Sequence, residues 1–553
     1  MKKKMLCLGM AFLIACSALF GCGSSSEPTE SSSTAEQTSS DSGVTLRLTQ
    51  SSGGSIDPGI GTDCTSGIAY ANMYDSLVYP DMDNVAQPLL ADTWETSEDG
   101  LTWTFHLKDG VKFHDGTDLE ASDVVYSMRR LQTLGEGFAY LFTNYVDSCE
   151  APDQQTVVFH MKQSFAPFLS ILPRLYVLNE DLVKANYQSG SYGDDGDFGK
   201  AFLAENDAGS GAYCLSEMRT GDRYIMKKNE DYFQGWEGKE KSPDTVEVIM
   251  NTEAATVRTM MKNGDIQISD QWQTNEDYDA LAQIDGVEVG SFVNGQMLYL
   301  MLNTKKAPTD DIHVRKALAY LIDYDQVCES LFPGYVKATS QVPDTLRGYV
   351  TDGWDYSYDL DKAKEELAQS PYAADLASGA MQLEVEWIAD VPDEEKLALL
   401  IQSLGSQIGL SVKVTKVPWA THVDNCGSVE TTPNASVCFE APEYAEAGAM
   451  LYQRYSSAMA GTWQETEWLQ DPELDAAIAD ALTTMDDDER MEKYAAIEKE
   501  AAENVWGIAV AEQSEKHAYK NNITIPAIER GMAGETTAMA LGYNYLFRDY
   551  EIN

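Results

Sequence analysis

A mixed α/β fold is predicted by three features of this 553-residue sequence. Large apolar residues alternate with polar ones over Leu101–Leu107, which is the period of a half-buried strand. The segments after Asp310 and Asp471 repeat apolar residues at helical spacing behind a capping carboxylate. The hydrophobic fraction of 43% is that of a globular protein, and no internal repeat is evident.

The first 22 residues have the pattern of an export signal. Lys2–Lys4 give a positively charged start, and Met5–Phe20 form an apolar stretch shorter than the roughly 20 residues of a membrane-spanning helix. The sequence that ends at Cys22 resembles the lipobox of bacterial lipoproteins, in which the cysteine is acylated. The sequence that ends at Cys16 also fits, but we prefer Cys22 because a polar tail begins directly after it.

Residues 23–43 are rich in serine and contain no aromatic and no large aliphatic residue. Such a segment cannot bury enough apolar surface to offset the entropy of folding. We therefore expect a flexible tether between the anchored cysteine and a folded region that begins near Val44.

The chain is strongly acidic, with 39 Lys and Arg against 89 Asp and Glu, which gives a net charge of −50. Phosphate binding needs basic patches, so nucleic acid is excluded as a partner. We interpret the acidity mainly as a solvated surface.

Cysteine and histidine spacing gives no support for a metal site, because there is no CxxC pair and no HExxH motif. An exported protein can form disulfides, and Cys426 and Cys438 are close enough in sequence to pair. Free, buried thiols are the alternative.

Leu101–Leu107 is the clearest strand. Asp109-Gly110 then predicts a reversal into Val111–Phe113, and Asp115-Gly116 predicts another turn, so we expect an antiparallel meander. Ser122 is the predicted cap of the helix that follows.

Three later helices have clear starts. Asp310 or Asp311 is expected to cap a helix that ends before Pro333-Gly334. Asp471, followed by a proline at the first helical position, begins a second helix, and the acidic run Asp486–Asp488 separates it from a third.

Segments in the same order along the chain carry a family resemblance. Pro88–Leu131 resembles the signature segment of the extracellular solute-binding proteins of the peptide/nickel class, family 5. Further similar segments are GSGAYCLSEMRTGDRYIMKKNEDYFQG from Gly209, LNTKKAPTDDIHVRKALAYLIDYDQV from Leu302, and Tyr358–Lys364. Ala212 and Leu360 stand where the family usually has proline.

The resemblance implies a two-lobed α/β clamp, of the periplasmic-binding-protein or Venus-flytrap kind, with an extra N-terminal α+β domain. Chain crossings between the lobes are expected near Met297–Asn303 and Asn504–Glu512. The implied boundaries are 1–22 for the signal and lipobox, 23–43 for the tether, 79–205 for the extra domain and 299–505 for lobe II. Lobe I would be assembled from three separate segments, 44–78, 206–298 and 506–553.

In the family, the region after the G-[IL]-x-V strand of lobe II, here Gly409–Val412, often holds an acidic motif with an acid that can neutralise a ligand ammonium group. The corresponding residues here are Glu440-Ala441-Pro442-Glu443, and the resemblance assigns that role to Glu440. Aromatic candidates for the cleft are Trp387, Trp419, Phe439, Tyr444 and Trp463.

The resemblance implies a substrate-binding lipoprotein of an ABC importer that captures a small organic ligand, first of all a di- or oligopeptide. Its partners would be the permease and ATPase complex of the importer. No cofactor is expected. We expect an exported monomer anchored by lipid to the outer face of the cytoplasmic membrane.

Several alternatives to a peptide ligand remain. They are an oligosaccharide, a nickel chelate, haem and an opine. A secreted hydrolase is the more distant alternative, because the sequence has no GxSxG elbow, no phosphate-binding loop and no assignable pair of catalytic carboxylates.

Overall fold

The computed structural model describes residues 43–51, 54–351, 353–389 and 391–553. The predicted signal, Cys16, Cys22 and all but the last residue of the predicted tether therefore lie outside the described residues. None of the helices in these ranges is both long enough and apolar enough to span a membrane.

Lobe I is built on a four-stranded sheet in the order β1-β10-β9-β8. β1 and β10 pair in parallel, and the other neighbours are antiparallel. The strands are β1 (Thr45–Gln50), β8 (Tyr213–Arg219), β9 (Arg223–Lys228) and β10 (Thr245–Met250). Because β1 lies about 200 residues before β10 in the chain, this sheet is assembled from separated segments.

The second sheet has the order β12-β16-β11-β15-β13-β14. Its strands are β11 (Val287–Leu302), β12 (Val336–Lys337), β13 (Leu383–Ile388), β14 (Val412–Val417), β15 (Ala435–Glu440) and β16 (Gly507–Lys520). Lobe II contains β13, β14 and β15, with helix α13 (Pro392–Ile408) packed against this region of the sheet.

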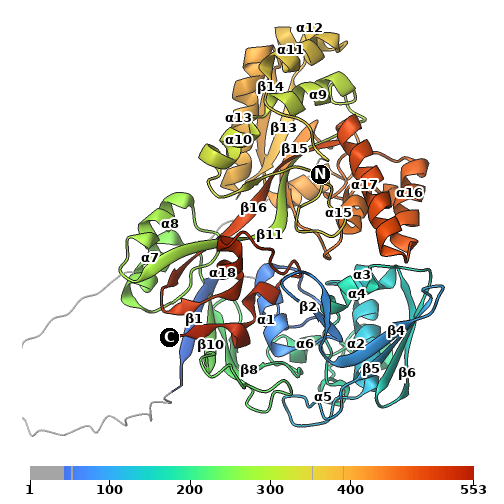
Figure 1. Cartoon of the computed structure of the whole chain (residues 1–553), viewed down its shortest axis with the longest axis vertical. Helices are drawn as coiled ribbons and strands as arrows, with labels where there is room; N and C mark the ends of the chain where they lie inside the picture. The colour runs from blue at the N-terminus through green and yellow to red at the C-terminus, as the bar shows by residue number, and fades with distance from the viewer. Residues whose placement is uncertain (1–42, 52–53, 352, 390) are drawn as a thin grey trace, which may run out of the picture. The chain divides into compact units, whose positions relative to one another are not determined.

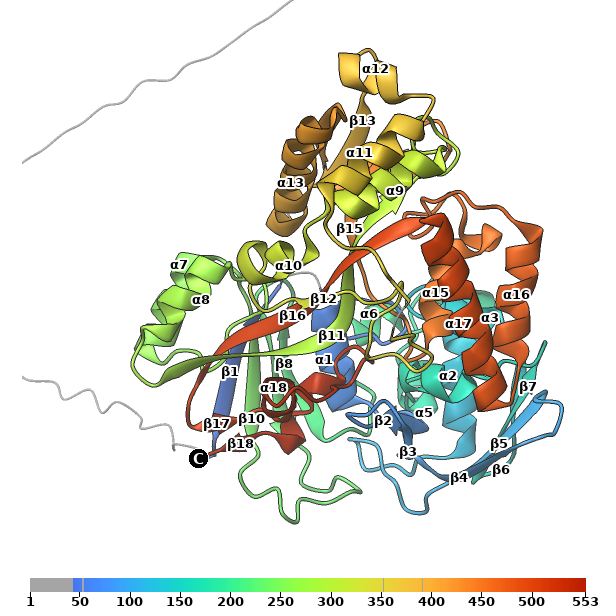
Figure 2. The same cartoon turned by 45° about the horizontal axis from the view of Figure 1, so that its top comes forward.

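Two long strands connect the lobes. β11 and β16 pair from Val287–Lys520 to Met301–Gly507, with an irregularity between Val293 and Met297. Figures 1 and 2 show them running side by side from the region of β1 and β10 to the region of β13 and β15. Most residues of the two segments expected to cross, Met297–Asn303 and Asn504–Glu512, lie in these strands.

The extra domain contains a third sheet, in the order β4-β5-β7-β6. Its strands are β4 (Ala91–Thr96), β5 (Thr102–Leu107), β6 (Val146–Asp153) and β7 (Thr156–Met161), and α2 (Ala121–Leu134) packs on it. β5 confirms the predicted strand, because Trp103, Phe105 and Leu107 are buried on alternate positions.

The predicted meander has the wrong strand partner. β5 pairs with β4 and β7, whereas Val111–Phe113 forms no strand and closes a local loop through the Lys112–Asp118 bridge. Both edges of β5 are occupied by β4 and β7, so Val111–Phe113 has no free edge of β5 to pair with. Val111 and Phe113 instead bury their side chains in the same core.

The helix starts follow local capping chemistry. Asp311, Asp471 and Asp486 accept backbone hydrogen bonds at the starts of α9 (Ile312–Leu321), α16 (Pro472–Thr483) and α17 (Asp487–Asn504), as predicted. The predicted cap at Ser122 is wrong. The N-cap of α2 is Glu120, two residues earlier, and it forms a capping box with Asp123. The helix after Asp311, α9, ends at Leu321, which agrees with the prediction that it ends before Pro333-Gly334.

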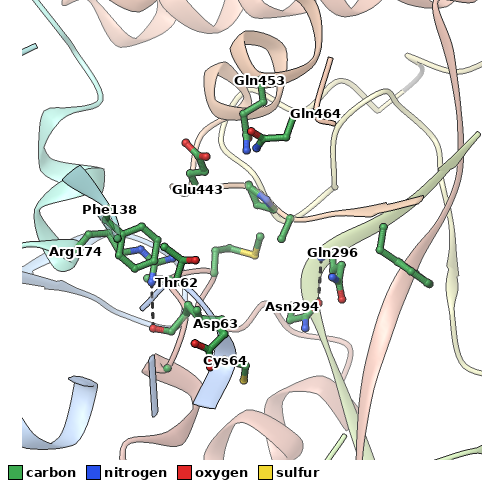
Figure 3. Close-up of a pocket in the computed structure, with 18 of the residues that line it drawn as sticks. Thr62, Asp63, Cys64, Phe138, Arg174, Asn294, Gln296, Glu443, Gln453 and Gln464 are labelled. Carbon is green, nitrogen blue, oxygen red and sulfur yellow. Dashed lines mark hydrogen bonds between the residues drawn. The ribbon is translucent and has the colours of Figure 1, made fainter. Parts of the chain in front are cut away.

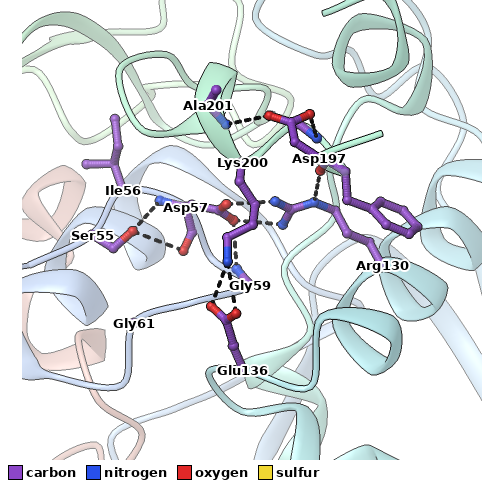
Figure 4. A network of polar contacts seen from close by, with 12 residues as sticks. Ser55, Ile56, Asp57, Gly59, Gly61, Arg130, Glu136, Asp197, Lys200 and Ala201 are labelled. Carbon is purple, nitrogen blue, oxygen red and sulfur yellow. Dashed lines mark hydrogen bonds and ion pairs between the residues drawn. The ribbon is translucent and has the colours of Figure 1, made fainter. Parts of the chain in front are cut away.

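The extra domain is joined to lobe I by a buried ion pair. Arg130 on α2 donates two hydrogen bonds of 2.7 Å to the carboxylate of Asp57, which lies between β1 and α1 (Cys64–Met73). Arg130 also donates to the Phe198 carbonyl at 2.7 Å, and Asp57 accepts from the Gly59 amide. Figure 4 shows this network, with the Lys200–Glu136 pair beside it.

We predict that Asp57→Asn destabilises the protein by about 3–5 kcal/mol, because it leaves the Arg130 guanidinium buried and unpaired. Urea unfolding of purified protein measures the change. Glu136→Gln is the matched control, since the Lys200–Glu136 pair is partly exposed and its loss should cost about 1 kcal/mol or less. Equal losses in the two variants would contradict the role assigned to Asp57.

Candidate functional site

A cavity of about 820 Å³ is lined by both lobes and by the extra domain. Figure 3 shows Gln453, Gln464 and Glu443 on one side, Thr62, Asp63 and Cys64 on another, and Asn294 and Gln296 from β11 on a third. The volume is in the range of pockets for small organic ligands. Amide side chains recur in the lining, at Asn144, Gln271, Asn294, Gln296, Gln453, Gln464, Gln513 and Asn544.

Glu443 brings a carboxylate to this cavity. It lies in the loop that follows β15, and Figure 3 shows its side chain beside Gln453 and Gln464. Burial raises its pKa to about 7, although hydrogen bonds from Tyr140 and Gln464 and the charge of Arg174 favour the ionised form. No cation in the described ranges lies within ion-pair distance of this carboxylate.

Arg174 is the cationic residue of the lining. It ends a short 3-10 helix (Leu172–Arg174), and its guanidinium lies 4.6 Å from the centre of the Phe138 ring. Nη1 donates to the Leu541 carbonyl at 3.2 Å. Within the described stretches of the chain it forms no ion pair, so its charge is not neutralised by a contacting carboxylate.

Glu515 on β16 also lines the cavity, but its charge is already balanced. Its carboxylate accepts hydrogen bonds from Asn294 at 2.7 Å and from Tyr545, and it lies 3.0 Å from His517 Nε2. Burial alone would raise the pKa of Glu515, but the hydrogen bond and charge of His517 outweigh burial and lower it. This group is therefore a fixed element of the cavity wall.

The predicted cleft residues are only partly brought together. Phe439 and Trp463 line the cavity, and Trp419 packs edge-on against Trp463 with ring centres 5.0 Å apart. Trp387 is buried in lobe II with Lys416 above its ring, and Tyr444 is buried against Phe165 of the extra domain. Of the five aromatic candidates, Trp419, Trp387 and Tyr444 are not among the lining residues.

The ligand role predicted for Glu440 is not supported by its position. Glu440 is the last residue of β15 and is 1% exposed, and its Oε2 lies 3.5 Å from Nη1 of the buried Arg454. The cation nearest to Glu440 is therefore the buried Arg454 and not a ligand in the cavity. The second acid of the same motif, Glu443, is the one that reaches the cavity.

The predicted disulfide is not formed. Cys426 and Cys438 are both free and buried. Cys426 follows α14 (Trp419–Asn425) with its sulfur 3.8 Å from His422 Nε2, whereas Cys438 is held in β15 with its sulfur near the Phe439 carbonyl. The two thiols thus have different contacts despite their short sequence separation.

Several lining residues carried no sequence signal. Arg174 and Trp272 belong to no motif, and they meet the Glu443 loop only because three distant segments fold together. Among the residues that the structure describes, no group of three His, Cys, Asp or Glu side chains could hold a metal ion.

Behind the cavity wall, three carboxylates surround Arg454. Glu440, Glu465 and Glu467 are at most 1% exposed, and Glu467 forms an ion pair with Arg454. Burial raises the pKa of Glu440 to about 8, of Glu465 to about 9 and of Glu467 to about 7. One arginine cannot balance three ionised carboxylates, so the folded state retains protons here at neutral pH.

We predict that the protein loses stability as the pH rises from 5 to 8. The folded-state pKa of Glu465 lies above its unfolded value of about 4.3, so between these values only the folded state holds the proton. Stability then falls by about 1.4 kcal/mol per pH unit for each such group. Glu465→Gln should reduce this slope in urea unfolding series, and an unchanged slope would contradict the assignment.

Comparison with known proteins places the chain in a family. The family profile described as "Bacterial extracellular solute-binding proteins, family 5 Middle" matches residues 85–461. The chain is 29% identical over 413 residues to the Probable D,D-dipeptide-binding periplasmic protein DdpA of Escherichia coli, covering 74% of this chain and 76% of that protein. It is 25% identical to Heme-binding protein A of Haemophilus influenzae, over 89% of this chain and 90% of that protein.

Solved structures share the fold. The ABC transporter substrate binding protein CtaP of Listeria monocytogenes superposes with a TM-score of 0.79 at 20% identity, covering 92% of this chain and 99% of that one. The periplasmic binding protein DppA of Helicobacter pylori, solved with the peptide STSA, gives 0.73 at 23% identity, with coverage of 92% and 98%. With the matched profile and the two-lobed architecture, these findings show that the chain belongs to the bacterial extracellular solute-binding proteins, family 5.

Proposed function

We propose that this protein is the substrate-binding component of an ABC importer and that it captures a di- or oligopeptide through the peptide's α-ammonium group. The bound peptide would lie in the cavity lined by both lobes and would be presented to the transmembrane permease. The observation that carries this proposal is Glu443, a half-buried carboxylate in the cavity wall with no ion-pair partner among the residues described.

The chemistry around Glu443 fits an ammonium ligand. The carboxylate is surrounded by neutral donors rather than by a paired cation, so an incoming ammonium would supply the missing charge. The charge of Arg174 offsets only part of the rise that burial causes in the pKa of Glu443. In the bound state the Arg174 guanidinium, which also donates to the Leu541 carbonyl, would donate to a carbonyl or carboxylate of the same ligand.

The rest of the lining fits a peptide backbone. Amide side chains both donate and accept, as peptide groups do, and they occur on both lobes. Aromatic residues such as Phe439 and Trp463 add apolar area that accommodates varied side chains. The names of the relatives support the same class, since one is named for D,D-dipeptides and one structure contains the peptide STSA.

We predict that Glu443→Gln weakens binding of tetra-alanine about thirty-fold or more. Removing one partner of a buried charge pair costs about 2–5 kcal/mol, because the ligand ammonium remains desolvated and unpaired. Calorimetry at pH 8 measures the change, because Glu443 with its pKa of about 7 is then mostly ionised.

Two controls sharpen this test. Glu440→Gln changes an acid in the same segment that does not line the cavity, so it should bind tetra-alanine within about threefold of wild type. N-acetylated tetra-alanine lacks the ammonium and should bind wild type as weakly as tetra-alanine binds Glu443→Gln. Wild-type affinity of Glu443→Gln for tetra-alanine would reject the ammonium role of Glu443, whereas no binding of tetra-alanine to wild type would favour another ligand such as an oligosaccharide.

The proposal includes export and lipid anchoring at Cys22, on the outer face of the cytoplasmic membrane, with the protein acting as a monomer. That face is the cell surface in a Gram-positive host and the periplasmic side in a Gram-negative one. The support is the lipobox-like sequence and the tether that follows it. An acyl chain would keep the binding protein close to its permease.

We predict that Cys22→Ala abolishes incorporation of labelled fatty acid, because the thiol that carries the lipid is gone. Metabolic labelling followed by gel analysis measures it. Cys16→Ala, which removes the other lipobox-like cysteine, should be labelled like wild type. If the two variants behave in the opposite way, Cys16 is the acylated residue.

A further inference from the structure

We infer that the cavity contains a subsite for an aromatic side chain of the ligand, built on Trp272 of lobe I and Trp463 of lobe II. This inference rests on the proposed function, since it specifies the class of peptide that the same cavity prefers. It is independent of the ammonium anchor at Glu443.

Trp272 is presented to the cavity rather than packed into the fold. It lines the cavity and is 53% exposed, which is more than any other tryptophan in the described ranges. An indole ring left in water forgoes a large amount of apolar burial. A ligand that covers this ring recovers that burial, so its exposure inside a cavity indicates a contact surface.

The loop that carries Trp272 is fixed from below by a buried carboxylate. Asp270 is fully buried, and its Oδ1 accepts a hydrogen bond of 2.9 Å from the Trp272 amide. Gln273 donates to both oxygens of Asp270, and Thr49 of β1 donates to Oδ2 at 3.0 Å. Tyr278 also donates to the Asp270 carbonyl. The backbone is therefore held in place while the indole remains exposed.

Trp463 is held in a similar way on lobe II. It lines the cavity and packs edge-on against Trp419. The residues that follow it are hydrogen-bonded to their surroundings, since the buried Glu465 carboxylate accepts from the Leu469 amide at 3.0 Å and the Thr304 hydroxyl donates to the backbone carbonyl of Glu467 at 2.7 Å. Each lobe thus contributes one indole on an anchored loop.

The chemistry of these walls selects a flat apolar group. The indoles offer no formal charge, and Met459 and Met539 in the same lining can adjust their shape around a ring. Aromatic rings associate favourably with indoles in stacked or edge-on arrangements. A phenylalanine, tyrosine or tryptophan side chain of a peptide is the group that fits.

The test uses tetra-alanine and the four peptides in which one alanine is replaced by phenylalanine. In wild type, one phenylalanine position should raise affinity about 10- to 100-fold over tetra-alanine, as expected for burying one such ring. Trp272→Ala should reduce this preference to less than threefold while tetra-alanine still binds within threefold of wild type. Trp272→Phe should restore most of the preference.

Tyr358→Ala is the matched control, because Tyr358 is an exposed aromatic residue (40%) that does not line the cavity. It should keep the full preference for phenylalanine. The inference is overturned, and the proposed function stands, if tetra-alanine binds but wild type shows no phenylalanine preference or Trp272→Ala retains it. If neither tetra-alanine nor any phenylalanine peptide binds wild type, the proposed function and the inference both fall.

Discussion

The bidentate ion pair between Asp57 and Arg130 is the contact on which the rest of the cavity wall depends. It joins the segment between β1 and α1 to helix α2, which lies more than 70 residues further along the chain. The residues that follow each partner, Ile60 to Cys64 and Gly137 to Phe138, both line the cavity. A methyl group at Gly137 would lie only 3.0 Å from the Gly59 backbone, so the two segments touch directly. Lobe I and the extra domain therefore form one continuous wall, and the β11 and β16 strands connect it to lobe II.

The many acids of this chain have three different roles. One set lies on the surface or caps helices, as Asp311 and Asp471 do. A second set is buried with a fixed partner, as Glu515 is with His517 and Glu440 with Arg454. Glu443 belongs to neither set, because it is half-buried at the cavity without an ion-pair partner in the stretches of chain described. Net charge alone could not separate these roles, whereas the position of the nearest cation does.

Local chemistry made much of the fold predictable. The alternation in β5 and the capping acids of α16 and α17 depend on neighbouring residues, so they could be located from the sequence, and the family segments indicated the two-lobed clamp. The partners of β5 could not be found in this way, because pairing with β4 and β7 depends on residues up to 60 positions away. The same limit applied to the cavity. Glu440 and Glu443 are three residues apart, and only Arg454, fourteen positions after Glu440, decides which of them is free to meet a ligand.

A crystal structure of the protein with bound tetra-alanine would show directly whether Glu443 anchors the ligand. We expect a peptide in the cavity between the lobes, with its terminal nitrogen about 2.7–2.9 Å from a Glu443 carboxylate oxygen. A peptide whose ammonium group contacts another residue, or a peptide bound outside this cavity, would contradict the role proposed for Glu443.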